Sequence, residues 1–237
     1  MAADFNCDLG EGTGNDALIM PYITSANIAC GYHAGDVYSI QQTVELCQQH
    51  NVNIGAHPSF LDKAGFGRTA YHLPESEIYE LIIQQLIIFS FVADTMNVKI
   101  RHVKPHGALY NMSAADAVIA GTIARAVKDF DPALILYGLS GSESIKQAQK
   151  IGLNTANEVF ADRTYQDDGS LTPRKYANAL ISEEEKAVGQ VLQMLQKGTV
   201  TTTSGKEIAI VADTVCLHGD GAHAVELAKA IHKAIMG

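Results

Sequence analysis

The sequence predicts an α/β protein, a single-domain (β/α) barrel of seven or eight mostly parallel strands. Short runs of β-branched and apolar residues alternate with helical patterns about seven times, which is typical of a parallel sheet. The 237 residues match the size of one large α/β domain. Right-handed crossovers at this length favour closure into a barrel, and an open doubly wound sheet is the alternative that periodicity leaves open.

Seven segments have the composition of buried strands, because they are short, apolar and bounded by turn residues. They span residues 4–8, 25–30, 52–56, 99–104, 133–137, 155–160 and 210–217. Residues 199–212 indicate a β-hairpin that turns at Ser204 and Gly205. We expect this hairpin to be a peripheral insertion in one domain that covers residues 1–237.

Helical patterns fill most of the intervals between these strands. Residues 37–50 follow Asp36, a good N-cap, and residues 74–96 open with a proline and two glutamates. Capping-box spacings predict further helix starts near Ala114, Gly141 and Glu183. A last helix is expected over residues 222–236, where apolar residues recur at helical spacing.

Four of the predicted strands lead into a histidine that has a glycine or proline within two residues, namely His33, His57, His106 and His218. The C-terminal ends of parallel strands meet at one edge of the sheet, where such folds bind their ligands. We therefore expect the four imidazoles to face one pocket.

Other polar residues accompany these histidines at the predicted strand ends. Lys104, for example, lies in a segment that should be buried, so it needs an anionic partner or a lowered pKa. The candidate catalytic residues are Asp8, His33, Asp36, His57, Lys104, His106, Glu158 and His218. The candidates for binding substrate or phosphate are Asn27, Arg68, Asn111 and Arg163.

Structural explanations compete with some of these assignments. Asp36 equally suits the N-cap of the following helix. A salt-bridge network of Asp162 and Arg163 is the alternative interpretation of the segment after Glu158.

Composition argues against several classes of partner. The net charge of −9 and the lack of a basic stripe argue against nucleic acid. The apolar stretch over residues 78–93 is too short to span a bilayer, and no secretory signal is visible. Four scattered cysteines without a C-x-x-C pair fit reduced thiols. We expect a cytoplasmic protein without membrane or nucleic-acid partners.

Six motifs in order resemble the LamB/YcsF family across residues 4–223. They are NCDLGE, SANIACGYHAGD, GAHPSF followed by GFGR, VKPHGALYN, EVFADRTY with GSLTPR, and CLHGD. The resemblance implies a (β/α) barrel akin to the glycoside hydrolase and deacetylase superfamily. It also implies ATP-dependent opening of the lactam of 5-oxoproline to L-glutamate, together with separate B and C subunits. Where GFGR ends, Thr69 replaces an arginine of the family pattern.

The candidate residues fit this chemistry, which needs proton transfer and binding of anionic oxygens. As a hypothesis, Asp8 and His33 or His57 serve as base, Lys104 and Arg163 bind anions, and His106 or His218 donates the proton. ATP is the expected co-substrate. Because the chain has no Walker A sequence, the nucleotide is held here in an atypical way or by the partner subunits.

Two other functions remain open. The first is a metal-dependent carbohydrate or amide deacetylase, in which Asp8 and two strand-end histidines hold a divalent ion. The second is a non-catalytic binding protein, which the number of ionisable groups at one predicted edge disfavours. The residues do not establish whether a metal takes part.

Overall fold

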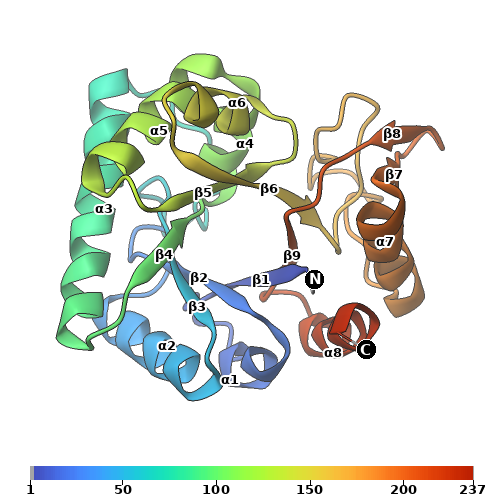
Figure 1. Cartoon of the computed structure of the whole chain (residues 1–237), viewed down its shortest axis with the longest axis horizontal. Helices are drawn as coiled ribbons and strands as arrows, with labels where there is room; N and C mark the ends of the chain where they lie inside the picture. The colour runs from blue at the N-terminus through green and yellow to red at the C-terminus, as the bar shows by residue number, and fades with distance from the viewer. Residues whose placement is uncertain (1–2, 237) are drawn as a thin grey trace.

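The computed structural model describes residues 3–236, in which seven parallel strands form a closed barrel surrounded by helices (Figure 1). The strands are β1 (Asp4–Leu9), β2 (Ser25–Ala29), β3 (Asn53–His57), β4 (Ile100–Val103), β5 (Ile135–Leu139), β6 (Asn154–Phe160) and β9 (Thr214–His218). Neighbours along the chain pair from β1 to β6, and β9 pairs with both β6 and β1. The predicted barrel is thus confirmed, and the open-sheet alternative is wrong.

Helices cover the outside of this barrel and connect its strands (Figure 1). They are α1 (Asp16–Ile19), the 3-10 turn η1 (Met20–Tyr22), α2 (Val37–His50), α3 (Glu75–Thr95), α4 (Gly107–Ala115), α5 (Ala117–Phe130), α6 (Glu143–Lys150), α7 (Glu184–Lys197) and α8 (Ala224–Met236). The strands β7 (Thr199–Thr201) and β8 (Glu207–Ala209) pair antiparallel outside the barrel, next to α7.

Two of the predicted helix starts differ from the observed ones, because the serine with capping-box spacing is not the N-cap of the helix. Ser113 lies inside α4, and its hydroxyl donates to the carbonyl of Tyr110. The next helix, α5, is capped by Asp116, whose carboxylate accepts from two backbone N–H groups. The predicted starts near residues 114 and 141 are therefore wrong, and α6 follows its N-cap Ser142.

Polar side chains fill the barrel interior because alternate residues of each strand point inward. At the N-terminal end of β1, the carboxylate of Asp4 accepts hydrogen bonds from four hydroxyl groups at 2.6–3.1 Å. These hydroxyls belong to Thr24, Ser25, Tyr137 and Thr214. At the C-terminal end of the same strand lies Asp8, whose partners are charged groups.

The layer between these carboxylates is made of amides and one imidazole. Asn27 donates to Asn6 and Asp8 and accepts from Nε2 of His102, which stacks on the ring of Tyr137. Gly55 makes room for His102, since a Cβ at this glycine would lie 2.1 Å from Nε2 of the imidazole. His102 is therefore a packing residue of the barrel interior.

Among residues 3–236, α3 is the one helix long and apolar enough to cross a membrane by length and composition. Its apolar residues Ile78, Ile82, Leu86 and Phe89 are buried in the core of this protein. Packing against the barrel thus accounts for the apolar face of α3.

Candidate active site

A cavity of about 650 Å³ opens at the C-terminal ends of the barrel strands. Its walls come from the ends of β1, β3, β6 and β9, from the segment after β4, and from the loop after β6. Eight of the predicted site residues line it: Asp8, His57, Arg68, Lys104, His106, Asn111, Arg163 and His218. The parallel register explains this convergence, because Asp8 pairs with Asn27 of β2 on one side and with His218 of β9 on the other.

Lys104 is buried between two carboxylates in the floor of this cavity. Its ammonium nitrogen lies 2.8 Å from Oδ1 of Asp8, 2.9 Å from Oε1 of Glu158 and 3.0 Å from Sγ of Cys216. Burial alone would lower the pKa of Lys104, but the negative charges of Asp8 and Glu158, with Cys216 beside them, raise it well above the ordinary value. Lys104 is therefore a permanent cation, as its predicted need for anionic partners requires.

Asp8 connects this cation to the histidines. Its Oδ1 accepts from Lys104 and Asn27, and its Oδ2 lies 3.4 Å from Nε2 of His57. Burial alone would raise the pKa of Asp8, but His57 and Lys104 lower it well below the usual range. Asp8 is consequently a weak base that carries a stable negative charge.

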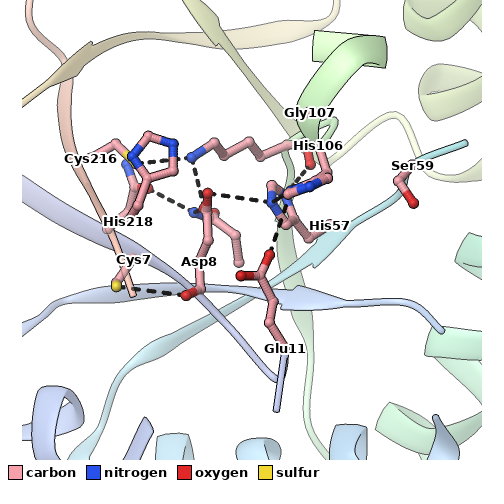
Figure 2. A network of polar contacts seen from close by, with 12 residues as sticks. Cys7, Asp8, Glu11, His57, Ser59, His106, Gly107, Cys216 and His218 are labelled. Carbon is pink, nitrogen blue, oxygen red and sulfur yellow. Dashed lines mark hydrogen bonds and ion pairs between the residues drawn. The ribbon is translucent and has the colours of Figure 1, made fainter. Parts of the chain in front are cut away.

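Glu11, His33, His57 and His106 form a buried cluster. Figure 2 shows Glu11, His57 and His106 of this cluster next to Asp8. One donor atom from each of the four lies within 4.8 Å of all the others. Nε2 of His57 is 2.9 Å from Nδ1 of His106, and Oε1 of Glu11 is 3.1 Å from Nε2 of His33. The rings of His33 and His106 stack at 3.8 Å. This donor set is compatible with a divalent metal ion.

Burial determines the protonation of this cluster. Desolvation, with the charge of His57 added, lowers the pKa of His33 to about 3. The pKa of His106 is lowered well below its usual value for the same reason, with His57 and His33 contributing. Desolvation and the charges of Asp8 and Asp220 raise the pKa of Glu11 well above its usual value. In the absence of a cation, burial thus disfavours the charged forms of His33, His106 and Glu11, whereas a bound cation would favour the ionised carboxylate of Glu11.

His218 and Asp162 form a dyad on another wall. Nδ1 of His218 lies 2.9 Å and 3.0 Å from the two carboxylate oxygens of Asp162, and it donates to them. Burial alone would raise the pKa of Asp162, but the charges of His218, Arg174 and Arg163 hold it below the ordinary value. The other ring nitrogen, Nε2, has no hydrogen-bond partner among the residues that the structure describes, and His218 lines the cavity. It is free to exchange a proton with a bound molecule.

Cationic side chains also line the cavity, although the protein as a whole is acidic. Besides Lys104 they are Arg68, Lys146, Arg163 and Arg174. Burial, with the charge of Arg174 added, lowers the pKa of Arg163 to about 10, so its guanidinium remains charged at neutral pH. Arg68 forms an ion pair with Asp220 of the β9–α8 loop. An anionic ligand would find counter-charges on this wall.

Several predicted site residues take other positions. Asp36 is exposed, and its carboxylate accepts from the backbone N–H of Ser39 as the N-cap of α2, so the structure places it outside the cavity. Asn27 lies below Asp8 in the barrel interior and holds that carboxylate in place. Neither His33 nor Glu158 lines the cavity, although each contacts another residue of the site. Asn111 lines the cavity, but its amide donates to the carbonyl of Gly107.

Two residues of the site, Glu11 and Ser59, are not among the predicted site residues. Glu11 lies in the loop after β1, three residues beyond Asp8, and its carboxylate close to a strand end was its only signal. Ser59 lies two residues after His57, and its hydroxyl contacts Nδ1 of His33 at 2.8 Å. No sequence pattern identifies this contact, because it depends on how the two loops pack.

Comparison with known proteins agrees with this architecture. The family model described as LamB/YcsF matches residues 3–237. The chain belongs to the LamB/YcsF family. The A subunit of the 5-oxoprolinase of Staphylococcus carnosus is 52% identical over 98% of this chain and 94% of its own length. The protein of the same name from Shouchella clausii is also 52% identical, over 96% of this chain and 92% of its own length.

Two solved structures have the same barrel fold as this member of the LamB/YcsF family. The lactam utilization protein from Thermus thermophilus superposes with a TM-score of 0.92 at 38% identity and covers 100% of this chain and 96% of its own. A family 4 carbohydrate esterase from Streptomyces lividans superposes with a TM-score of 0.52 at 11% identity, over 100% of this chain and 88% of its own. The esterase shows that the expected likeness to the deacetylase barrel holds at the level of the fold.

Proposed function

We propose that this chain is the lactam-opening component of an ATP-dependent 5-oxoprolinase, which hydrolyses 5-oxoproline to L-glutamate with cleavage of ATP. The names of its 5-oxoprolinase relatives and of the lactam utilization protein support this assignment. The observation that carries it is the cavity itself. Cationic side chains suited to an anionic substrate line the same space as a histidine whose ring nitrogen is free to transfer a proton.

The chemistry requires an activated amide. A five-membered lactam is stabilised by resonance, and transfer of a phosphoryl group from ATP to the amide oxygen would convert it into a reactive imidate. Water then adds to the ring carbon, and the C–N bond breaks as the nitrogen takes up a proton. A second water hydrolyses the resulting acyl phosphate to the carboxylate of glutamate and inorganic phosphate. Water attack and ring opening thus need a proton acceptor and a proton donor in the same cavity.

His218 is suited to both steps. Asp162 holds its Nδ1–H, so that Nε2 accepts the proton of the attacking water and returns it to the lactam nitrogen as the ring opens. Arg163 and Arg174 bind the anionic oxygens of the substrate. Asp8, with its lowered pKa, keeps Lys104 and His57 in place and stabilises positive charge that develops near them.

ATP enters this scheme through partner proteins. The chain has no Walker A sequence, so we assign nucleotide binding to the companion B and C subunits, which pass an activated substrate to this cavity. We further propose that the complex works in the cytoplasm. The purified chain alone is then nearly inactive toward 5-oxoproline.

The experiment measures 5-oxoproline-dependent ATP cleavage and glutamate formation with and without the companion subunits. Glutamate formation should require all subunits, and His218→Asn should lower it by about 10²–10⁴-fold. His50→Asn is the matched control, because His50 is exposed at the end of α2. Glutamate release by the isolated chain with ATP, or full activity of His218→Asn, would refute the proposal.

A metal-dependent amide or carbohydrate deacetylase is the second candidate, because four metal-ligating groups lie together in the site. This function predicts hydrolysis of acetylated sugars or simple amides without ATP once a divalent ion is added. Incubation of the metal-loaded chain with such substrates and no nucleotide distinguishes the two functions. Turnover in that assay favours the deacetylase, and turnover only with 5-oxoproline, ATP and companion subunits favours the 5-oxoprolinase.

A further inference from the structure

We propose that Glu11, His33, His57 and His106 form a built site for one divalent transition-metal ion of the zinc class. The ligand atoms are Nε2 of His33, Nε2 of His57, Nδ1 of His106 and a carboxylate oxygen of Glu11. The proposal does not depend on the substrate, because it follows from where the hydrogens of the three imidazoles must lie.

Backbone carbonyls determine the hydrogen positions of two rings. Nδ1 of His57 lies 2.7 Å from the carbonyl oxygen of Lys104, and Nε2 of His106 lies 2.9 Å from that of Phe66. A carbonyl oxygen only accepts, so each of these nitrogens carries the hydrogen. In the neutral rings, Nε2 of His57 and Nδ1 of His106 are consequently bare lone pairs.

A hydroxyl determines the third ring. The oxygen of Ser59 lies 2.9 Å from the carbonyl oxygen of Phe60 and 2.8 Å from Nδ1 of His33. Its single hydrogen is donated to the carbonyl of Phe60, so the hydroxyl accepts from Nδ1–H of His33. Nε2 of His33 is therefore also a lone pair, and it faces Oε1 of Glu11 at 3.1 Å.

When Glu11 is ionised, as a bound cation would keep it, three nitrogen lone pairs and a carboxylate point toward each other without hydrogens between them. Nε2 of His57 and Nδ1 of His106 are 2.9 Å apart, and Nδ1 of His106 is 3.5 Å from Oε1 of Glu11. Ligand atoms around a tetrahedral zinc ion, with bonds of about 2.0–2.1 Å, are separated by about 3.3 Å. The observed separations of 2.9, 3.1 and 3.5 Å bracket this value, and a cation at the centre would replace these three repulsive contacts with four metal–ligand bonds.

In metal sites, each ligating histidine usually donates its other ring N–H to a fixed acceptor, which orients the ring. The three histidines of this cluster have such acceptors, and neighbouring residues hold the acceptors in place. Gln85 on α3 clamps Ser59 by accepting from its backbone N–H and donating to its carbonyl, both at 2.9 Å. Gly67 lies against the stacked rings, and a Cβ there would approach His106 to 2.7 Å and His33 to 2.9 Å. The four side chains are almost fully buried, so their conformations are already fixed before a metal ion binds.

Asp8 is excluded from this ligand set, contrary to the ligands that the sequence suggested for a metal-dependent hydrolase. Its Oδ1 is engaged by Lys104 and Asn27, and the ammonium group of Lys104 stands on that side. Its Oδ2 lies 3.4 Å from Nε2 of His57, but Asp8 is not among the four residues whose donor atoms all lie within 4.8 Å of one another. The carboxylate of the ligand set comes instead from Glu11.

The test is metal titration of the full-length protein after removal of bound metal with a chelator. Calorimetry with Zn²⁺ and the visible absorption of Co²⁺ should show one site per chain, with the intense bands of tetrahedral cobalt, and bound Zn²⁺ should raise Tm. Glu11→Gln and His106→Asn should abolish the cobalt bands. Ser59→Ala removes only the anchor of His33 and should weaken binding by about 10–100-fold.

Two controls keep the test decisive. His218→Asn changes a histidine of the same cavity outside the cluster, and His50→Asn changes an exposed one, so both should bind metal as the unmodified chain does. Circular dichroism of each variant establishes that it is folded. A protein without saturable binding, or with binding that Glu11→Gln and His106→Asn leave unchanged, overturns the metal site and leaves a proton shared by His57 and His106 as the explanation. Because no readout uses lactam hydrolysis, this failure is separate from failure of the proposed function.

Discussion

The two carboxylates of β1 occupy opposite ends of one barrel and have opposite surroundings. Asp4 accepts hydrogen bonds from four neutral hydroxyls and has no cation within ion-pair distance among the residues that the structure describes. Asp8, four residues along the same strand, has Lys104 at 2.8 Å and His57 at 3.4 Å. The cavity opens at the Asp8 end.

The two ends of the barrel interior thus have different roles, stability at Asp4 and chemistry at Asp8. Neutral hydroxyls satisfy the lone pairs of Asp4 and leave no group that could exchange a proton with a ligand. Around Asp8, cations and imidazoles stabilise its charge but also extend to the cavity. The hydrogen bonds of Asp4 are all satisfied within the barrel and stabilise it, so we call this the closed end. At the Asp8 end, which we call the open end, some charged groups and imidazoles also line the cavity and can react with a ligand.

The largest expected effect is loss of activity at the open end. Asp8→Asn removes the negative charge between Lys104 and His57, and we expect kcat/KM of the assembled 5-oxoprolinase to fall by about 10²–10⁴-fold. Glutamate formation in the complete enzyme measures it. If Asp4→Asn lowers the activity of the folded enzyme equally, the proposed distinction between the two ends is wrong.

The next effect concerns the layer that separates the two carboxylates. Gly55→Ala would place a Cβ 2.1 Å from the ring of His102, which Asn27 holds by a hydrogen bond and Tyr137 by stacking. We expect a loss of about 3 kcal/mol in the free energy of unfolding, measured with urea.

A matched glycine supplies the control for that substitution. Gly189 lies in α7 with no atom near its missing Cβ, so Gly189→Ala should stabilise the protein by about 0.5–1 kcal/mol. Equal effects of the two alanines would mean that His102 can rearrange and that the central layer is not rigid.

A smaller effect is expected at the closed end. Asp4→Asn keeps one accepting oxygen but replaces the other with a donor that faces hydroxyls, so unfolding should become about 1–2 kcal/mol easier. Thermal unfolding gives the change in stability, and glutamate formation per folded molecule should remain as in the unmodified enzyme. A stable variant with impaired turnover would contradict this assignment.

The smallest effect is a pH dependence on the open side. Because the folded pKa of Asp162 lies below its ordinary value of about 3.9, its carboxylate stabilises the folded state above that pH. This contribution is lost as pH falls through the folded pKa. The Tm of the unmodified protein should exceed that of Asp162→Asn at pH 7, and the difference should shrink in acid below about pH 4. A gap that widens on acidification would reverse the assigned sign.

The sequence predicted the barrel well because its strands and their ends have local signatures. The bounds of α2 and its cap Asp36 followed from local pattern alone. Helix α4 was missed, since it starts directly after His106 in a segment interpreted as a strand end. The roles of Glu11 and Ser59 depend on packing between separate loops, and the charge state of Lys104 depends on Glu158 from a distant strand. Contacts between residues far apart in the chain leave no periodic pattern in the sequence from which they could be predicted.

The direct pairing of β6 with β9 has a consequence for how this protein can vary. Residues 161–213 leave the cylinder and return to it, so they form an excursion that contributes no strand to its circumference. Insertions or deletions within the hairpin of β7 and β8 would leave strand number and shear unchanged. The same excursion contains Arg163 and Arg174, so a change in its length would alter which molecules are recognised while the barrel stays constant.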